Sequence, residues 1–132
     1  MSLIKWIEFQ SLGDERGELI SLEGKKNIPF TIKRIYYLFG MKADIPRGFH
    51  AHKRLKQVAI CVKGSCDILM DDGIYKETVS LNSPNKGLVI DVMQWHEMRN
   101  FSDDCLIIVL ASDLYDEDDY IRDYSVFKRK VS

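Results

Sequence analysis

Short runs of β-branched and aromatic residues, each closed by a turn signal, recur along most of this 132-residue chain. The strongest run is residues 31–39, and the clearest turn is Asp71-Asp72-Gly73 between two alternating runs. An Asp-Gly pair in that position is a strong hairpin signal. About ten short strands separated by turns are typical of an all-β sandwich or barrel. The stretches expected to hold strands are residues 5–12, 18–22, 31–39, 47–57, 57–62, 65–70, 75–81, 88–92, 95–101 and 105–111.

The pattern changes near the C-terminus, where the acidic run Asp116–Asp119 comes first and the basic run Lys128–Lys130 comes last. Between them, large side chains follow at helical spacing, namely Tyr120, Ile121, Tyr124 and Phe127. Acidic residues at the start and basic residues at the end suit the dipole of a helix. We therefore expect a short C-terminal helix packed on the barrel.

The size and charge of the chain narrow the class of protein. The length suits one domain spanning residues 1–132. A formal net charge of −1 gives no bulk attraction to nucleic acid or to anionic membranes. There is no apolar run near 18 residues, so no membrane span is expected, and the first residues lack the order of a signal peptide. Cys61, Cys66 and Cys105 form no C-x-x-C pair, which favours buried, reduced thiols in a cytoplasmic protein.

Two of the three histidines, His50 and His52, lie two residues apart in the stretch Arg47–Gln57. In an extended strand this spacing puts both imidazoles on one face. Titratable groups are costly to bury without partners, so this face lines a cavity or meets solvent. The flanking strands favour a cavity, and we interpret the stretch as a catalytic or ligand-binding wall.

The histidine pair belongs to a longer pattern, in which H-x-H is followed after four residues by Gln57 and after six more by Gly64. A third histidine, His96, is followed four positions later by Asn100. This spacing is similar to the two motifs of the cupins, whose fold is a β-barrel or jelly roll. Gln57 stands where the cupin motif has glutamate, and an amide oxygen is a poorer ligand for first-row divalent metals than a carboxylate. Other departures from the motifs are Asp44, Asp91 and Met93. The pattern therefore favours a single cupin-type domain with a metal-free acid/base site.

Several further segments carry a more specific resemblance. They are RGFHAHK from Arg47, GSC from Gly64, DDG from Asp71, WHEM from Trp95 and ASDLYDEDDYIRDY from Ala111. Together they resemble the sugar 3,4-ketoisomerases, the FdtA-like and WxcM-like cupins, along nearly the whole chain. The resemblance implies a metal-free barrel that needs no cofactor, a homodimer, and a dTDP-linked 4-keto-6-deoxy sugar in the barrel mouth. It also implies a place in dTDP-3-amino-sugar synthesis.

Moving a keto group from carbon 4 to carbon 3 of dTDP-4-keto-6-deoxyglucose needs proton transfer through an enediol-type intermediate, and no redox cofactor. Histidine titrates in the right range for the base. The resemblance implies that His50 is this base, and His52 on the same face could shuttle protons or hold the intermediate. Tyr36 is the third catalytic candidate, because it shares a strand face with Arg34 and its hydroxyl can donate to an oxyanion. Its alternative is a barrel-lining aromatic residue whose hydroxyl has another partner.

A diphosphate needs cations, and arginine suits fork-like phosphate contacts. The predicted substrate-binding set is Arg16, Arg34, Arg47, Arg99, His96 and Gln57. Arg34 and Arg47 flank the proposed cavity in sequence, whereas Arg16 lies in a loop that could reach a neighbouring subunit. Arg99 lies three residues from His96, which puts it on the opposite face of a regular strand.

Three alternatives stay open at this point: an epimerase acting on the same sugar, a non-catalytic sugar-binding cupin, and a metal-dependent cupin oxygenase. The sequence also leaves open the division of labour between His50 and His52, the nucleotide, the final glycan pathway and the configuration at carbon 4 of the product.

Overall fold

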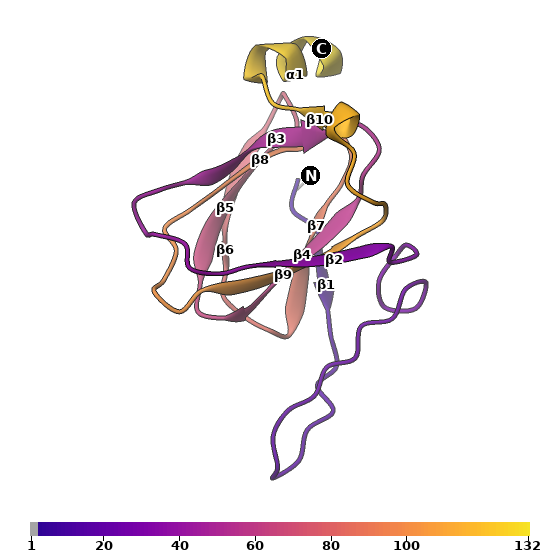
Figure 1. Ribbon diagram of the computed structural model, residues 1–132, viewed down its shortest axis with the longest axis vertical. Coiled ribbons are helices and arrows are strands. Elements are labelled where there is room, and N and C mark those ends of the chain that lie inside the picture. The colour runs from indigo at the N-terminus through magenta and orange to yellow at the C-terminus, as the bar shows by residue number, and fades with distance from the viewer. Residues whose placement is uncertain (1–2) are drawn as a thin grey trace.

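The computed structural model describes residues 3–132, which form two facing five-stranded antiparallel sheets (Figure 1). The first sheet has, in spatial order, β1 (Trp6–Glu8), β7 (Lys86–Ile90), β4 (Gln57–Lys63), β9 (Leu106–Ala111) and β2 (Arg34–Leu38). The second has β10 (Tyr120–Ile121), β3 (Arg47–His52), β8 (Trp95–Arg99), β5 (Cys66–Asp71) and β6 (Lys76–Leu81). The predicted all-β barrel with a short C-terminal helix is confirmed.

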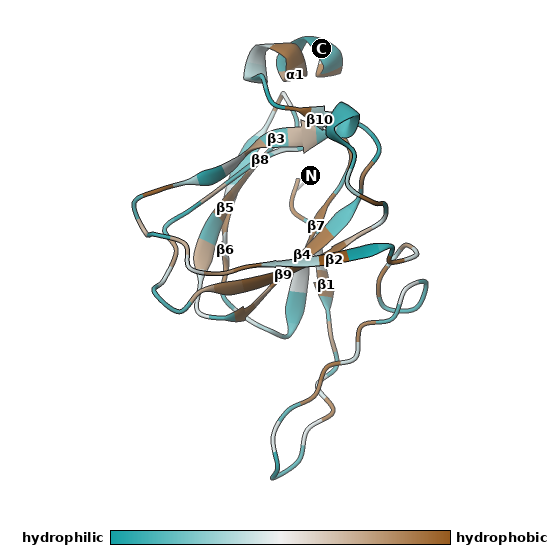
Figure 2. Ribbon diagram, in the orientation of Figure 1, coloured by the Kyte–Doolittle hydropathy of each residue, from teal (hydrophilic) through white to brown (hydrophobic). Residues whose placement is uncertain are grey.

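The space between the sheets is filled by the inward side chains of alternating strand residues. Ile68 and Met70 of β5, Leu88 of β7 and Ile107 of β9 are fully buried there. Figure 2 shows the hydrophobic residues concentrated along strands such as β9. The cysteines predicted to be buried and reduced, Cys61, Cys66 and Cys105, are buried and free. Apolar packing fills one end of the barrel, and the polar residues described below occupy the other.

The N-terminal segment covers the outer face of the first sheet. Its contact with that face is a cluster of buried residues: Phe9, Ile28, Phe30, Val58, Ile60 and Leu110. The strand expected over residues 5–12 is limited to Trp6–Glu8, and residues 18–22 form no strand. The reason is visible in Figure 1, where part of this segment projects from the barrel as an arm with no sheet edge beside it. Within the arm, Leu12 N donates to Leu19 O at 2.7 Å.

The C-terminal helix is shorter than the sequence pattern predicted. Tyr120 and Ile121 form β10, after a 3₁₀ turn over Glu117–Asp119, and the helix α1 spans only Tyr124–Val131. The carboxylate of Asp123 accepts hydrogen bonds from two backbone N–H groups of the first helical turn, and this cap sets where α1 begins. Phe127 of α1 is fully buried against the outer face of the second sheet. No helix within residues 3–132 is long and apolar enough to cross a membrane.

Candidate active site

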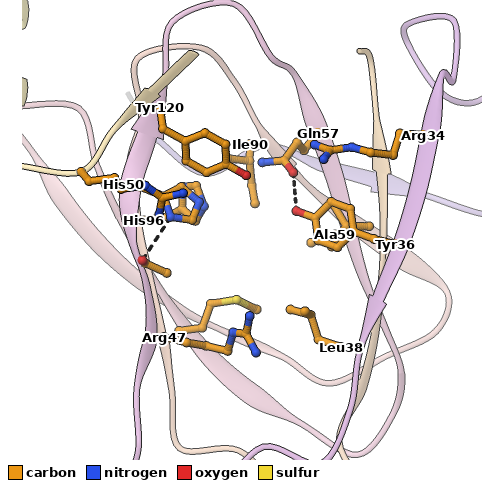
Figure 3. Close-up of a pocket in the computed structure, with 14 residues that line it drawn as sticks. Arg34, Tyr36, Leu38, Arg47, His50, Gln57, Ala59, Ile90, His96 and Tyr120 are labelled. Atoms are coloured by element: carbon orange, nitrogen blue, oxygen red, sulfur yellow. Dashed lines mark hydrogen bonds between the residues drawn. The ribbon is translucent and has the colours of Figure 1, made fainter. Parts of the chain in front are cut away.

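The polar end of the barrel encloses a cavity of about 480 Å³ between the two sheets. Figure 3 shows His50, His96 and Tyr120 on one side of it and Arg34, Tyr36 and Gln57 on the other. Of the residues predicted from the sequence, those that line the cavity are Arg34, Tyr36, Arg47, His50, Gln57 and His96. The fold therefore brings together, from β2, β3, β4 and β8, groups that lie far apart in the chain.

A bulge in β3 orients two of these residues. Gly48 and His50 pair with consecutive residues of β8, so Phe49 is an extra residue in the strand. Both bulge residues have positive φ, 98° at Gly48 and 61° at Phe49. On a regular strand Arg47 and His50, three residues apart, would face opposite sides. The extra residue turns both of them into the cavity, and backbone strain of this kind is characteristic of functional sites.

Each of the three histidines uses its Nδ1 atom in a contact with a protein oxygen atom. For His50 and His96 the partner is the backbone carbonyl two residues earlier, at 3.1 Å and 3.3 Å, and for His52 it is Asp119 Oδ2 at 3.1 Å. These oxygens only accept hydrogen bonds, so in each neutral ring Nδ1 carries the proton. Each Nε2 atom is left with a lone pair, which is what a proton acceptor needs.

Burial sets the protonation states of the site. It lowers the pKa of His50 to about 4, helped by the charge that His52 carries when protonated. It also lowers the pKa of His96 to about 3, helped in the same way by His50. Burial, with the neighbouring Tyr120, raises the pKa of Tyr36 to about 12. At neutral pH the cavity therefore holds neutral imidazoles that accept protons and a tyrosine hydroxyl that donates one.

Gln57 and Tyr36 form a hydrogen-bonded pair across β2 and β4. The Tyr36 hydroxyl donates to Gln57 Oε1 at 2.5 Å, so the amide oxygen at the cupin glutamate position already has a partner. No group of three or more His, Cys, Asp or Glu side chains within residues 3–132 is arranged to hold a metal ion. The guanidinium carbon of Arg34 lies 5.2 Å from the centre of the Tyr36 ring, and Arg34 Nε is buried without a hydrogen-bond partner in the described part of the chain.

His52 shares the face of His50, as predicted, but lies deeper. Its ring is packed behind His50 and Tyr120, with ring centres 5.1 Å and 4.4 Å away, and it does not line the cavity. Burial lowers the pKa of His52, while the hydrogen bond to Asp119 opposes that shift. Its Nε2 atom is buried and has no hydrogen-bond partner among residues 3–132.

Two polar residues that line the cavity, Tyr120 and Arg122, were not predicted as site residues. Tyr120 pairs with His52 in the β10–β3 ladder, and its ring centre lies 5.0 Å from that of His50. The Arg122 guanidinium carbon lies 4.1 Å from the centre of the Tyr120 ring, and Arg122 Nε donates to Glu117 at 2.7 Å. Alternation could have revealed both, because the residue between them, Ile121, is buried under α1 on the other face.

Two predicted substrate-binding arginines lie away from the cavity. Arg16 is at the tip of the projecting arm, highly exposed, with Nε donating to Asp14 at 3.0 Å. Arg99 pairs with Glu97 on the face of β8 opposite His96, because β8 is regular over this span. The substrate-binding prediction for Arg99 is therefore corrected: its side chain does not reach the cavity of its own subunit.

Comparison with known proteins connects this cavity to a family. The sequence model for FdtA, described as WxcM-like, C-terminal, matches residues 2–132. A TDP-4-oxo-6-deoxy-alpha-D-glucose-3,4-oxoisomerase of Aneurinibacillus thermoaerophilus is 52% identical over 128 residues, which are 97% of this chain and 92% of the relative.

Solved structures agree with that match over nearly the full length. A 3,4-ketoisomerase from Helicobacter canadensis has a TM-score of 0.95 and 51% identity, covering 99% of this chain and 98% of that one. A histidine-to-asparagine variant of the 3,4-ketoisomerase QdtA from Thermoanaerobacterium thermosaccharolyticum, in complex with TDP-4-keto-6-deoxyglucose, has a TM-score of 0.96 and 40% identity, covering 99% and 95%.

Proposed function

We propose that this chain, which belongs to the FdtA family of WxcM-like proteins, is a sugar-nucleotide 3,4-ketoisomerase. Membership of the family predicted from the sequence motifs is confirmed. The substrate we propose is TDP-4-keto-6-deoxyglucose and the product its 3-keto isomer, in keeping with the names of the relatives. The observation that carries the proposal is His50, a neutral imidazole that presents a bare Nε2 atom to a cavity lined with arginines.

The reaction is an internal transfer of two protons. His50 Nε2 removes the proton from carbon 3, the C–H electrons form a double bond to carbon 4, and the carbon 4 carbonyl becomes an enolate oxygen. The proton of the carbon 3 hydroxyl passes to the carbon 4 oxygen, a transfer we assign to His52; because its ring lies behind His50 and Tyr120, one of those side chains has to move for the proton to reach it. The carbon 3 oxygen then becomes a carbonyl, and His50 returns its proton to carbon 4. Tyr36 stays protonated at neutral pH, and to donate to the enolate oxygen it has to give up its hydrogen bond to Gln57 Oε1.

The cavity supplies the positive charge that an anionic substrate needs. Arg34 and Arg47 line it from β2 and β3, and the unpartnered Nε–H of Arg34 is a donor without an acceptor in the described residues. Buried donors are costly to leave unpaired, and arginine binds phosphate and enolate oxygens well. We assign these two arginines, with His96 and Gln57, to substrate binding. A carbon 3 ketone is the group that an amination step consumes, which supports a role in 3-amino-sugar synthesis as part of the proposal.

Incubation with TDP-4-keto-6-deoxyglucose in D₂O, followed by NMR of the products, tests the function directly. We expect a ketone at carbon 3, and deuterium at carbon 4 because the proton held on His50 Nε2 exchanges with D₂O before it is returned to the sugar. A product that keeps its ketone at carbon 4 would identify an epimerase. Binding without any exchange would identify a sugar-binding protein, and either result would overturn the proposal. The same spectrum gives the configuration at carbon 4.

The lowered pKa of His50 predicts an unusual pH profile. A base must be neutral, so a pKa of about 4 keeps His50 active well below the range of an ordinary histidine, which is half protonated near pH 6.5. We expect kcat/KM to stay level from pH 7 to about pH 5 and to fall below that as His50 is protonated. Steady-state assays after preincubation at each pH separate this loss from unfolding. A fall in kcat/KM centred near pH 6.5 would contradict the assignment.

We also propose that the protein is a cytoplasmic homodimer. The outer face of the edge strand β2 exposes Ile35, Tyr37 and Phe39, each at least 60% accessible. Contiguous apolar surface of this kind marks protein interfaces. The projecting arm beside this sheet exposes Leu12 and Leu19, which suits packing against a second copy. Support for the cytoplasm comes from the three free cysteines, because oxidising compartments favour disulfides.

In the proposed dimer, the projecting arm would place Arg16 at the substrate site of the other subunit. Arg16→Ala and His50→Asn homodimers should each be nearly inactive, since one loses a binding residue and the other the base. Unfolding and refolding an equal mixture should recover about a quarter of wild-type activity, because half of the dimers are then hybrids with one intact site of two. No recovery would show that Arg16 acts within its own subunit, and full activity of Arg16→Ala would remove it from the site.

A further inference from the structure

Asp119 is a buried carboxylate behind the cavity wall, and it binds the chain that connects β3 to β4. Its Oδ1 accepts from Arg54 N at 2.7 Å, and its Oδ2 accepts from Leu55 N at 3.3 Å and from His52 Nδ1 at 3.1 Å. Its backbone oxygen accepts from Lys53 N at 3.0 Å. The residue is only 5% exposed, so these contacts replace water almost completely. Nothing in the mechanism above uses this carboxylate.

The contacts determine which nitrogen of His52 carries the proton. A carboxylate oxygen can only accept, so Nδ1 must donate, and Nε2 is left as a buried acceptor that has no partner among residues 3–132. If His52 takes up a proton at Nε2, the ring becomes positively charged while its Nδ1–H still points at Asp119. Charge-assisted hydrogen bonds are stronger than neutral ones, so the carboxylate stabilises that state.

The turn that holds Asp119 also connects His52 with the cavity wall. Asp119 is followed directly by Tyr120, which pairs with His52 in the β10–β3 ladder and packs its ring on both His50 and His52. A shift of Asp119 would therefore move a wall residue as well as the proton on His52.

We propose that Asp119 is a positioning residue of the isomerisation: it holds His52 as the Nδ1–H tautomer, so that Nε2, buried behind His50 and Tyr120, is the atom that takes up the sugar hydroxyl proton. The proton goes to Nε2 and leaves from it, and Asp119 itself is never protonated. This inference rests on the proposed function and deepens it, because it explains how His52 can act as a proton carrier.

The variant Asp119→Asn reverses the polarity of the contact with His52. With the amide oxygen at the Oδ1 position, which keeps the 2.7 Å bond from Arg54 N, the NH₂ group replaces Oδ2 and the 3.3 Å bond from Leu55 N is lost. The NH₂ group donates, so His52 Nδ1 must become an acceptor and the proton moves to Nε2. Loss of an outer-shell partner of a metal-binding histidine typically costs about 10- to 100-fold, and we take the same range for this metal-free histidine. We expect kcat to fall by about 100-fold at the upper end of that range, with KM nearly unchanged.

The matched control is Asp118→Asn, the same substitution one residue earlier, at an exposed side chain in the same turn. We expect wild-type kcat from it. The double variant Asp119→Asn/His52→Asn should be no slower than His52→Asn alone, because a positioning residue has nothing left to position. If the two losses multiply, Asp119 supports the fold rather than His52, and the proposal is wrong.

A spectroscopic measurement keeps the test independent of activity. In ¹⁵N NMR of histidine-labelled protein at neutral pH, we expect the His52 signals of a neutral Nδ1–H ring in the wild type and of an Nε2–H ring in Asp119→Asn. An Nε2–H ring in the wild type would overturn the inference even if Asp119→Asn does not fold. If the expected tautomers appear but the wild type shows no isomerisation, the proposed function has failed and the tautomer assignment stands.

Discussion

His50→Asn should lower kcat by about 10³-fold, within the range that a general base contributes, while the protein still binds TDP. Asparagine can replace the Nδ1–H hydrogen bond to the Gly48 carbonyl, which is 3.1 Å long, but it cannot take up a proton from carbon 3. The loss should therefore appear in kcat rather than in ligand affinity. The measurements are kcat from the NMR assay and TDP affinity from calorimetry.

Exchange with solvent provides the internal control for His50→Asn. If the base is lost, substrate recovered from D₂O should carry no deuterium at carbon 3, and thermal unfolding should match the wild type within a few degrees. A variant that retains more than a tenth of the wild-type rate would show that another group removes the proton. His96, which also presents its Nε2 side to the cavity, would then be tested next.

Gly48→Ala should damage both stability and activity through the β3 bulge. A Cβ atom at Gly48 would lie 3.0 Å from His96 O and 3.3 Å from Glu97 Cα, and φ is +98°, a conformation that L residues rarely adopt. We expect a loss of about 3 kcal/mol in the free energy of unfolding, the upper end of the cost of a strained backbone position. Arg47 and His50 flank the bulge, so kcat should fall by about 10²-fold as the base is displaced. Urea unfolding and the NMR assay measure the two effects.

The matched control is Gly40→Ala, at another glycine with positive φ. There φ is +71° and no atom lies within 4 Å of the added Cβ, so only the backbone conformation is penalised. That penalty is about 1–2 kcal/mol, and activity should be unchanged because Gly40 is outside the cavity. Equal losses of activity in both variants would show that the close approach of β3 to β8 does not position the site.

Features that depend on neighbours in the chain could be predicted from the sequence. Period-two alternation placed His50 and His52 on one face, and the Asp71-Asp72-Gly73 turn does join β5 to β6. Tyr36 and Arg34 share the inward face of β2 for the same reason. The cupin spacing also placed Gln57 in the cavity, although nothing in the spacing indicated that Tyr36 would bind its amide oxygen.

Features that depend on distant partners could not be predicted in the same way. Phe49 is an extra residue only when β3 is paired with β8, so no pattern in the sequence around Arg47 predicts that the bulge turns Arg47 into the cavity. Tyr120 fits a helical spacing and a short strand equally well, and the β10–β3 pairing decided between them. His52 was expected at the cavity surface because it shares a strand face with His50. Alternation predicts the face of a residue but not its depth, so the burial of His52 behind His50 was missed.

The pairing of β3 with β10 also has a consequence for how fast the protein can fold. His52 and Asp119 are 67 positions apart, and the strands on either side of the cavity also pair with remote segments, as in Arg34 with Ala111 and His50 with His96. Closing such large loops costs entropy before any contact repays it, which is why β topologies of this kind fold in milliseconds to seconds. The lowered pKa values of His50 and His96 arise from burial, so they depend on the closure of these distant contacts around the cavity.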